Sequence, residues 1–377
     1  MRGSEERKAT GAFAFTAGDG AARSGTGPLE ISDAGVGAGG TTIEFLDVDA
    51  VDEGDRDVTL RLFPAGSLRL SQLARRHETF VKVLREAWYE ARTGGLLAHG
   101  IAAPATFAGT VRRPPPERPV SLLIYPTHLT VVPSDGGVFQ VPFGAVETVT
   151  FDGAAWNVSV SATGGPFDFS QLARQTDPFF HALEDGVAAQ ARRLSEISDS
   201  SLFADGNGVE ASKLDRFDQL LESWTAPERL DGAKALVAAG ERAKTRLGLV
   251  ELLDPDEEGL AAKEPLPPNV AAFLLVPRGG EIVLEILSGP SAATYLFRGE
   301  MESLNRDLQA IHFRRRPLSL TEKEMEGSAG RPYRLAFRKL EPLRRLRAAT
   351  TGRILHTEGW KDQVVGRIVS TRGSSGS

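Results

Sequence analysis

The segment Ser71-Gln72-Leu73-Ala74-Arg75 occurs twice in this chain, the second time as Ser170-Gln171-Leu172-Ala173-Arg174, 99 positions later. Apolar positions around the two segments also correspond. The offset changes by one residue where the five residues Phe63–Ser67 are opposite the six residues Ser161–Pro166. A hairpin turn is expected there, and hairpin turns tolerate a change of length. Since the correspondence extends over about 60 positions, it predicts an internal repeat. The other corresponding pairs are Ile43/Val141, Phe45/Phe143, Val48/Val146, Val51/Val149, Leu60/Val158, Leu62/Val160, Phe80/Phe179 and Leu84/Leu183, with Leu29/Leu122, Ile31/Ile124 and Val36/Leu129 further upstream.

Each copy of the repeat reads as a series of short strands followed by one helix. Up to Phe169 in the second copy, apolar residues alternate with polar ones, which is typical of strands. Beyond it, Phe179 and Leu183 are spaced as on one face of a helix, and Phe80 and Leu84 have the same spacing in the first copy. The strands expected in the second copy are 121–125, 129–132, 138–142, 146–151, 156–161 and one through Phe167 and Phe169.

Short strands followed by one amphipathic helix predict a curved antiparallel sheet or barrel whose open end the helix covers, because that packing buries the apolar faces of both elements. This arrangement resembles the pleckstrin-homology-like (PH-like) fold, in which seven strands form a bent barrel capped by a C-terminal helix. The chain thus resembles a tandem PH-like domain protein of bacterial type. The resemblance covers residues 10–95 and 105–197 and rests on pattern, without a signature motif. It implies binding of lipids, peptides or partner domains, and it transfers no catalytic residue.

After the second copy, residues 198–253 are expected to hold a linker and a helical segment. Ser, Asp and Gly dominate 195–212, as in flexible linkers, and 214–221 and 227–247 have helical patterns. Residues 254–269 are acidic and rich in proline, which predicts a second linker.

A smaller α+β unit with a basic C-terminal helix is expected over residues 268–368. Strands are predicted over 270–276, 281–287 and 293–297, and a helix over 301–311. This order is similar to the second half of each repeat, so the unit is either a partial third repeat or an unrelated domain. The predicted fold class is α+β, with tandem antiparallel bent barrels followed by helices and this unit.

The composition is that of a globular protein with several domains. Of its 377 residues, 41% are apolar and 25% are charged, and no cysteine is available for disulfides, thiolate metal sites or thiol nucleophiles. The longest apolar stretch in the C-terminal half, Val270–Val276, is far below the roughly 20 residues that cross a bilayer. The first residues lack the apolar region of a secretory signal, so a cytoplasmic location is expected.

Charge is distributed unevenly along the chain. The net charge is −6, yet residues 314–372 hold 15 Lys and Arg against 6 Asp and Glu, while the remainder holds 29 against 44. Such asymmetry predicts either an anion-binding tail or docking of the basic segment onto the acidic body of the same chain.

The patterns that suggest metal or cofactor chemistry fail on their context. Gly35–Gly40 has the spacing of a dinucleotide-binding loop, but such a loop opens a helix, and strand-like sequence follows here, so a hairpin turn is expected. Six carboxylates between Asp47 and Asp57 lack the register of a calcium loop, which favours a solvated turn. The six histidines have no metal-binding spacing, and neither a nucleophile elbow nor a phosphate-binding loop occurs. We therefore expect no catalytic residue, metal site or cofactor.

The first of two basic features consists of Arg112, Arg113 and Arg118 around Pro114–Pro116, in the loop expected between the first two strands of the second copy. In lipid-binding relatives of the PH-like fold, that loop supplies cations for phosphorylated head groups, and arginine binds phosphate through two hydrogen bonds. This sequence departs from their lysine-led pattern, and the corresponding loop Asp19–Arg23 of the first copy is not basic. A partner that binds the polyproline segment and a solvated loop are the alternatives.

The second basic feature is the segment 331–347, in which apolar residues recur at helical spacing while Arg334, Arg338 and Arg345 lie on other faces. Pro342 is expected to break the helix or restart it. An amphipathic basic helix binds an anionic membrane, an acidic partner, or the acidic body of its own chain. Nucleic acid is not expected, because neither a helix-turn-helix nor a sheet of stacking aromatics accompanies the charge.

From these features we expect a non-enzymatic cytoplasmic adaptor or scaffold that binds protein or peptide partners through tandem PH-like domains, because two linked modules raise avidity without a strong single site. The alternative is a peripheral binder of anionic membrane lipids through the Arg112–Arg118 loop and the basic C-terminal helix. An enzyme with a site assembled from distant residues is a third hypothesis, favoured by a cleft that holds carboxyl groups with shifted pKa values or a pair of histidines. A homo-oligomer is compatible with each.

Overall fold

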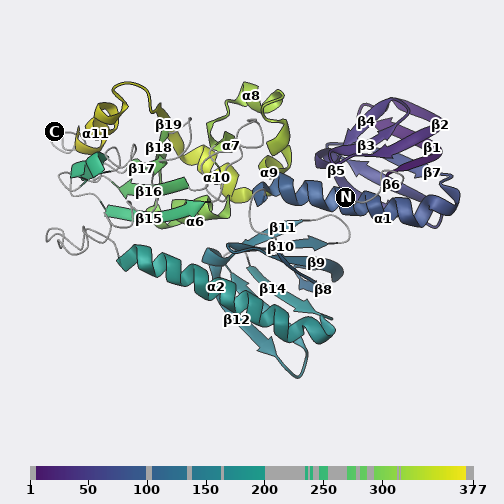
Figure 1. Cartoon of the computed structure of the whole chain (residues 1–377), viewed down its shortest axis with the longest axis horizontal. Helices are drawn as coiled ribbons and strands as arrows, with labels where there is room; N and C mark the ends of the chain where they lie inside the picture. Colours follow the sequence, from purple (N-terminus) through teal and green to yellow (C-terminus); the bar gives the residue numbers. More distant parts are fainter. Residues whose placement is uncertain are drawn as a thin grey trace.

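The computed structural model describes residues 6–98, 104–133, 138–162, 165–199, 234–236, 238–240, 246–253, 270–276, 281–286, 293–311, 314 and 316–370. These residues form a mixed α+β structure with three antiparallel sheets, two of seven strands and one of five (Figure 1). The α+β class predicted from the sequence is therefore confirmed. Among the described residues, no helix is both long enough and apolar enough to cross a membrane.

The two seven-stranded sheets have the same topology. The first strand of each pairs with both the second and the seventh, so the spatial orders are β4-β3-β2-β1-β7-β6-β5 and β11-β10-β9-β8-β14-β13-β12. The first sheet consists of β1 (Lys8–Ala17), β2 (Ala22–Ile31), β3 (Gly35–Ala38), β4 (Thr41–Glu44), β5 (Val48–Glu53), β6 (Asp57–Leu62) and β7 (Gly66–Ser71). The second consists of β8 (Ala105–Arg113), β9 (Arg118–Ile124), β10 (His128–Pro133), β11 (Phe139–Pro142), β12 (Val146–Asp152), β13 (Asn157–Ala162) and β14 (Gly165–Ser170).

Local irregularities coincide between the two sheets at the offset of the repeat. A one-turn helix, η1 (Phe45–Asp47), precedes β5, and its counterpart η4 (Phe143–Ala145) precedes β12. A bulge then interrupts the pairing of each following strand, after Val48 and after Val146. Because bulges and turns are specific local features, their coincidence makes the repeat a property of the structure as well as of the sequence.

The repeated five-residue segment forms the turn between the last strand of each sheet and the helix that follows. Its glutamine and alanine adopt the left-handed backbone conformation, which residues other than glycine seldom do. The leucine between them, Leu73 or Leu172, is buried in the core of its own repeat. The φ angles are 58° at Gln72, 47° at Ala74, 56° at Gln171 and 50° at Ala173.

Gly11 in β1 and Gly109 in β8 lie against this turn. A Cβ atom would lie 2.7 Å from the Ser71 carbonyl oxygen at Gly11, and 3.0 Å from the Ser170 carbonyl oxygen at Gly109. We expect Gly11→Ala to lower the free energy of unfolding by about 1–3 kcal/mol, because the backbone must shift, and Gly109→Ala to lower it less. Gly27→Ala is the matched control, since its Cβ would meet nothing within 4 Å. Denaturant unfolding measures each variant, and equal losses at Gly11 and Gly27 would contradict the steric explanation.

A long helix packs against each seven-stranded sheet. The first contributes Phe80 and Leu84 to a core shared with its sheet, and the second contributes Phe179 and Leu183 to a separate core. The helical patterns predicted around Phe80 and Phe179 are thus confirmed. The two helices are α1 (His77–Thr93) and α2 (Thr176–Asp199).

The third sheet has five strands in chain order, unlike the order that the two repeats share. The three strands predicted from the sequence are present, but the first and the fifth strands of the sheet are not predicted. The first begins within 227–247, where the sequence pattern predicts a helix. Within 227–247, residues 234–236 and 238–240 are described as helix, and α2 extends over 195–199, where a linker was expected. The predictions for 200–212, 214–221 and 254–269 lie outside the described residues. The strands are β15 (Arg246–Leu253), β16 (Val270–Val276), β17 (Glu281–Ile286), β18 (Ala293–Arg298) and β19 (Thr350–Leu355).

Short helices fill the excursion between β18 and β19, and one helix follows β19. Leu340 is extended, with φ −96° and ψ 97°, and Pro342 lies in the first turn of the next helix, so the predicted break at this proline is confirmed. The helices between β18 and β19 share a third core with the third sheet and with Leu96 and Leu97, which lie between the two repeats. The helices are α6 (Met301–Ala310), α7 (Arg316–Ser319), α8 (Glu322–Glu326), α9 (Arg334–Lys339), α10 (Glu341–Ala349) and α11 (Trp360–Ser370).

Candidate functional site

The glycine-rich and acidic segments of the first repeat form turns between strands. Gly39 and Gly40, with φ 57° and 77°, connect β3 to β4, which confirms the hairpin turn predicted for this glycine run. In the acidic stretch, Asp52 pairs with Arg61 at 2.8 Å across β5 and β6. Among the described residues, no three His, Asp or Glu side chains are grouped so that they could hold a metal ion.

The arginines around the polyproline segment flank the connection between β8 and β9, the first two strands of the second sheet, and Arg112 and Arg113 are the last residues of β8. Arg113 pairs with Asp168 at 3.1 Å, and Arg112 lies 3.8 Å from Glu117. Arg118 is the first residue of β9. Arg112 and Arg113, two of the candidate anion-binding cations, therefore already have a carboxylate beside them.

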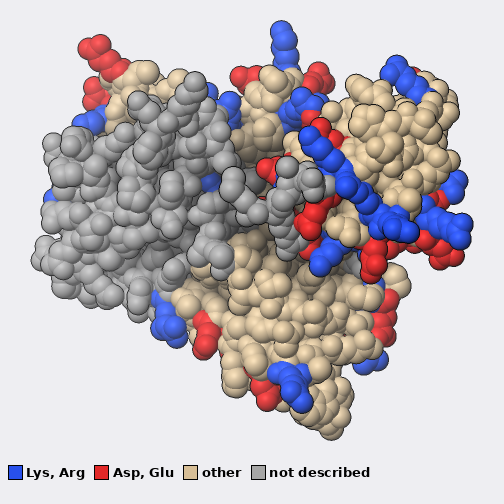
Figure 2. Space-filling view, turned by 45° about the vertical axis from the view of Figure 1, so that its right-hand side comes forward, with Lys and Arg blue, Asp and Glu red and all other residues tan. Residues whose placement is uncertain are grey.

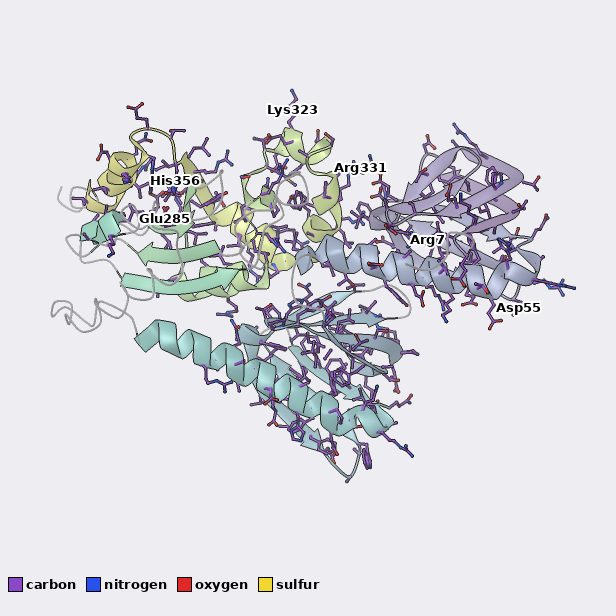
Figure 3. The ribbon with its side chains drawn as sticks, in the orientation of Figure 1. Arg7, Asp55, Glu285, Lys323, Arg331 and His356 are labelled. Atoms are coloured by element: carbon purple, nitrogen blue, oxygen red, sulfur yellow. The ribbon has the colours of Figure 1, made fainter. Side chains whose placement is uncertain are left out.

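Arg334 and Arg338 lie at a junction between α9 and the first repeat. Arg334 lies 3.6 Å and Arg338 lies 3.7 Å from the carboxylate of Asp47, and Arg338 also donates a hydrogen bond to the carbonyl oxygen of Leu46. Just before α9, Arg331 donates to Glu44 at 2.8 Å (Figure 3). These contacts are the docking of the basic segment onto the acidic body that the charge asymmetry predicted as one alternative.

Burial shifts the pKa values of two arginines at this junction. It lowers the pKa of Arg338, and the carboxylates of Asp49 and Asp47 oppose that shift. Arg92 at the end of α1 is fully buried and donates to the carbonyl oxygen of Val48, and burial lowers its pKa to about 10. In Figure 2, Lys, Arg, Asp and Glu side chains are dense around the first repeat, whereas the visible face of the second repeat is largely uncharged.

Arg345, the last of the predicted site residues, binds a carboxylate on a neighbouring helix. Its Nε and Nη2 atoms donate to the two carboxylate oxygens of Asp307 in α6, at 2.9 and 2.6 Å. The hydrogen bond to Asp307 is the main reason why the pKa of Arg345 is raised. Such a bidentate pair fixes α10 against α6.

This pair borders a groove between the second sheet and the C-terminal helices, which we call the β11 groove. The groove has a volume of about 440 Å³, and the rings of Phe139 and Phe167 stack on its sheet side with centroids 5.5 Å apart. Volumes of this size are typical of binding sites. The groove is lined by Phe139, Gln140, Val141, Pro142, Ala145, Ala162 and Phe167 of the second repeat, Ser303, Arg306, Asp307 and Ala310 of α6, and Lys339, Leu340, Glu341, Pro342 and Arg345 of the α9–α10 segment.

The charges of the β11 groove are not balanced. Asp307 is bound by Arg345, and Glu341 accepts a hydrogen bond from Arg344 at 3.1 Å. Arg306 and Lys339 also line the groove, and neither forms an ion pair with another residue in the described part of the chain. An apolar floor beside two uncompensated cations suits a ligand that is both apolar and anionic.

A second cavity, of about 360 Å³, lies on the first sheet. Phe13, Phe15, Ile43 and Leu68 give it apolar walls, and Arg23 supplies one cation. No side chain from the C-terminal helices reaches its lining in the described residues. Of the predicted anion-binding arginines, Arg345 lines the β11 groove, and none lines this second cavity.

A buried polar cluster in the third sheet is relevant to the enzyme hypothesis. The Thr294 hydroxyl donates to Glu285 at 2.6 Å, His356 Nε2 lies 3.0 Å from the same carboxylate, and the His356 ring stacks on Trp360 of α11 (Figure 3). Burial raises the pKa of Glu285, and the hydrogen bond with His356 opposes that shift. Glu285 and Thr294 are fully buried and line neither cavity. Because a general base must reach its substrate, we interpret the cluster as the attachment of α11 to the sheet.

The basic segment 331–347 singled out from the sequence contributes Lys339, Leu340, Glu341, Pro342 and Arg345 to the groove, but sequence reasoning did not identify the groove itself. Phe139 and Phe167 read as alternating strand residues, and nothing local indicates that their rings stack at a cavity. Arg306 lies on α6, outside the basic segment that contains Lys339, and has no motif around it. The feature of the sequence that pointed to this place was the predicted helix break at Pro342, because Pro342 lines the groove where one helix ends and the next begins.

A scan of protein-family models and a search of curated proteins found no match to this chain.

Proposed function

We propose that the chain is a non-enzymatic adaptor or scaffold, in which two PH-like domains and the C-terminal helices hold a binding groove for a protein or peptide partner. The proposal assigns PH-like domains to residues 10–95 and 105–197. It is supported by the matching seven-stranded order of the two sheets and by the long helix packed against each of them. The observation that carries the binding role is the 440 Å³ β11 groove, with its stacked aromatic floor.

Membrane binding, the alternative drawn from the sequence, is supported less. It needs the cations of the C-terminal helices to face an anionic surface. Arg334 and Arg338 instead lie beside Asp47, and Arg345 is bound to Asp307.

Ser303 offers a direct test of the groove. It is an exposed residue of α6 on the groove lining, so a larger side chain there fills the cavity without entering a core. We expect a selection from a displayed peptide library against the full chain to enrich peptides whose binding is lost in Ser303→Trp and kept in Ser303→Ala. Isothermal titration calorimetry of the enriched peptides measures the difference. A library without enriched peptides, or peptides that bind Ser303→Trp as well as the parent chain, would contradict the proposal.

A further inference from the structure

The two repeats present corresponding surfaces to the C-terminal helices. Glu44, Leu46 and Asp47 of the first repeat correspond to Pro142, Gly144 and Ala145 of the second at an offset of 98. In the first repeat, this surface is covered by α9 and the residues before it. In the second, Pro142 and Ala145 line the β11 groove. The groove is therefore the counterpart of a surface on which a polypeptide segment is already seated.

The difference between the two surfaces is one of charge. The first repeat supplies the carboxylates of Glu44 and Asp47, which pair with arginines of the C-terminal segment. The second repeat has proline and alanine at the same places, so it supplies none. Arg306 and Lys339 also line the groove, and within the described residues they form no ion pair.

A ligand would then supply the negative charge that balances Arg306 and Lys339. The carboxylates that are present, Asp307 and Glu341, are taken by Arg345 and Arg344. The floor beside the cations is apolar and aromatic. A segment with an apolar side chain against Phe139 and Phe167 and a carboxylate near Arg306 and Lys339 would satisfy both features.

From this correspondence we infer that the β11 groove binds an acidic, apolar peptide segment of a partner protein, an inference that rests on the adaptor function proposed above. The partner's Asp or Glu side chain forms ion pairs with Arg306 and Lys339. Its neighbouring aliphatic or aromatic side chain packs on the Phe139–Phe167 pair. A peptide is favoured over a small carboxylate because the corresponding surface of the first repeat takes a polypeptide segment.

The composition of the selected peptides tests the charge. We expect peptides that depend on the groove to carry Asp or Glu next to an apolar residue, and their Glu→Gln or Asp→Asn analogues to bind about tenfold more weakly. The double variant Arg306→Glu/Lys339→Glu is expected to lose the acidic peptides and to select Lys- or Arg-containing ones. Lys323→Glu is the control, because Lys323 extends from α8 into solvent (Figure 3) and does not line the groove.

Each outcome separates this inference from the proposed function. Groove-dependent peptides that are neutral or basic, or that bind the double variant as well as the parent chain, would overturn the inference and leave the adaptor function standing. Hexanoate or phenylpropionate binding as tightly as the peptides would overturn the assignment to a peptide. Absence of any groove-dependent peptide would count against the adaptor function itself, and the inference would fall with it.

Discussion

Replacing Phe179 with alanine is expected to lower the free energy of unfolding of the second repeat by about 3–5 kcal/mol, because its ring is removed from a core that cannot collapse around the cavity. Phe179 is fully buried and makes edge contacts with Phe107 at 5.3 Å and Phe169 at 5.7 Å between ring centroids. Its counterpart Phe80 is equally buried in the first core. We expect Phe80→Ala to have a loss of similar size, confined to the first repeat.

Hydrogen–deuterium exchange read by mass spectrometry distinguishes the two cores. Phe179→Ala should raise exchange in β8–β14 and α2, and Phe80→Ala in β1–β7 and α1, since the two cores are separate clusters. Phe180→Ala is the control, because the neighbouring ring is partly exposed. If either substitution raised exchange equally in both repeats, the description of two independent cores would be wrong.

Acid is expected to weaken the second repeat through His128. This histidine is buried at the start of β10, its ring stacks on Tyr125 at 4.6 Å, and its Nε2 lies 3.3 Å from the side-chain nitrogen of Gln140. Desolvation lowers the pKa of His128 from 6.5 to about 3. A neutral ring that accepts a hydrogen bond from Gln140 fits this environment, whereas a protonated ring would set two donors against each other.

The sign of the effect follows from the two states. Below pH 6.5 the unfolded chain binds a proton on His128 that the folded chain does not bind until about pH 3, so the free energy of unfolding falls as the pH is lowered through this window. At about 1.4 kcal/mol per pH unit, the loss between pH 7.5 and pH 4.5 is about 2–3 kcal/mol. The raised pKa of Glu285 acts in the opposite direction, because protonation of that carboxyl group stabilises the fold.

Urea unfolding at pH 7.5 and pH 4.5 measures the effect, with His128→Gln as the comparison. Glutamine does not titrate, and the contribution of Glu285 is common to both proteins, so the difference between their pH dependences belongs to His128. We expect the variant to lose about 2–3 kcal/mol less than the parent chain over this range. Parallel losses in the two proteins would show that His128 does not carry the acid sensitivity.

The sequence predicted those parts of the fold that are encoded locally. Strands β9 to β14 of the second repeat fall where the sequence predicts strands, and the helices around Phe80 and Phe179 follow the helical spacing. β15 (Arg246–Leu253) was missed because the Ala-, Lys- and Arg-rich residues before it favour a helix, whereas its strand conformation is set by pairing with β16. The glycines at positions 11 and 109 were also missed, although they correspond in the two copies, because their role depends on a carbonyl group some 60 residues away.

The β11 groove could not be predicted because none of its walls is local. Phe139 and Arg306 are brought together only by packing of α6 against the second sheet, and the charge of Arg345 is compensated by Asp307, 38 residues earlier. Sequence reasoning identifies which arginines are available, but which of them remain uncompensated depends on these tertiary pairs. That is why Arg334, Arg338 and Arg345 were candidates from the sequence, while the groove cations that form no ion pair within the described residues are Arg306 and Lys339.

Leu96 and Leu97, at the start of the segment that joins the two repeats, are part of the third core and are buried beside Leu335. Side-chain packing in this core, and not only the length of the connecting chain, therefore sets the spacing of the two repeats. A partner that engages both repeats at once would have to match a fixed distance between its own contact points. A single repeat cut out of the chain would, in turn, expose apolar side chains that the packing around Leu96 and Leu97 covers in the full chain.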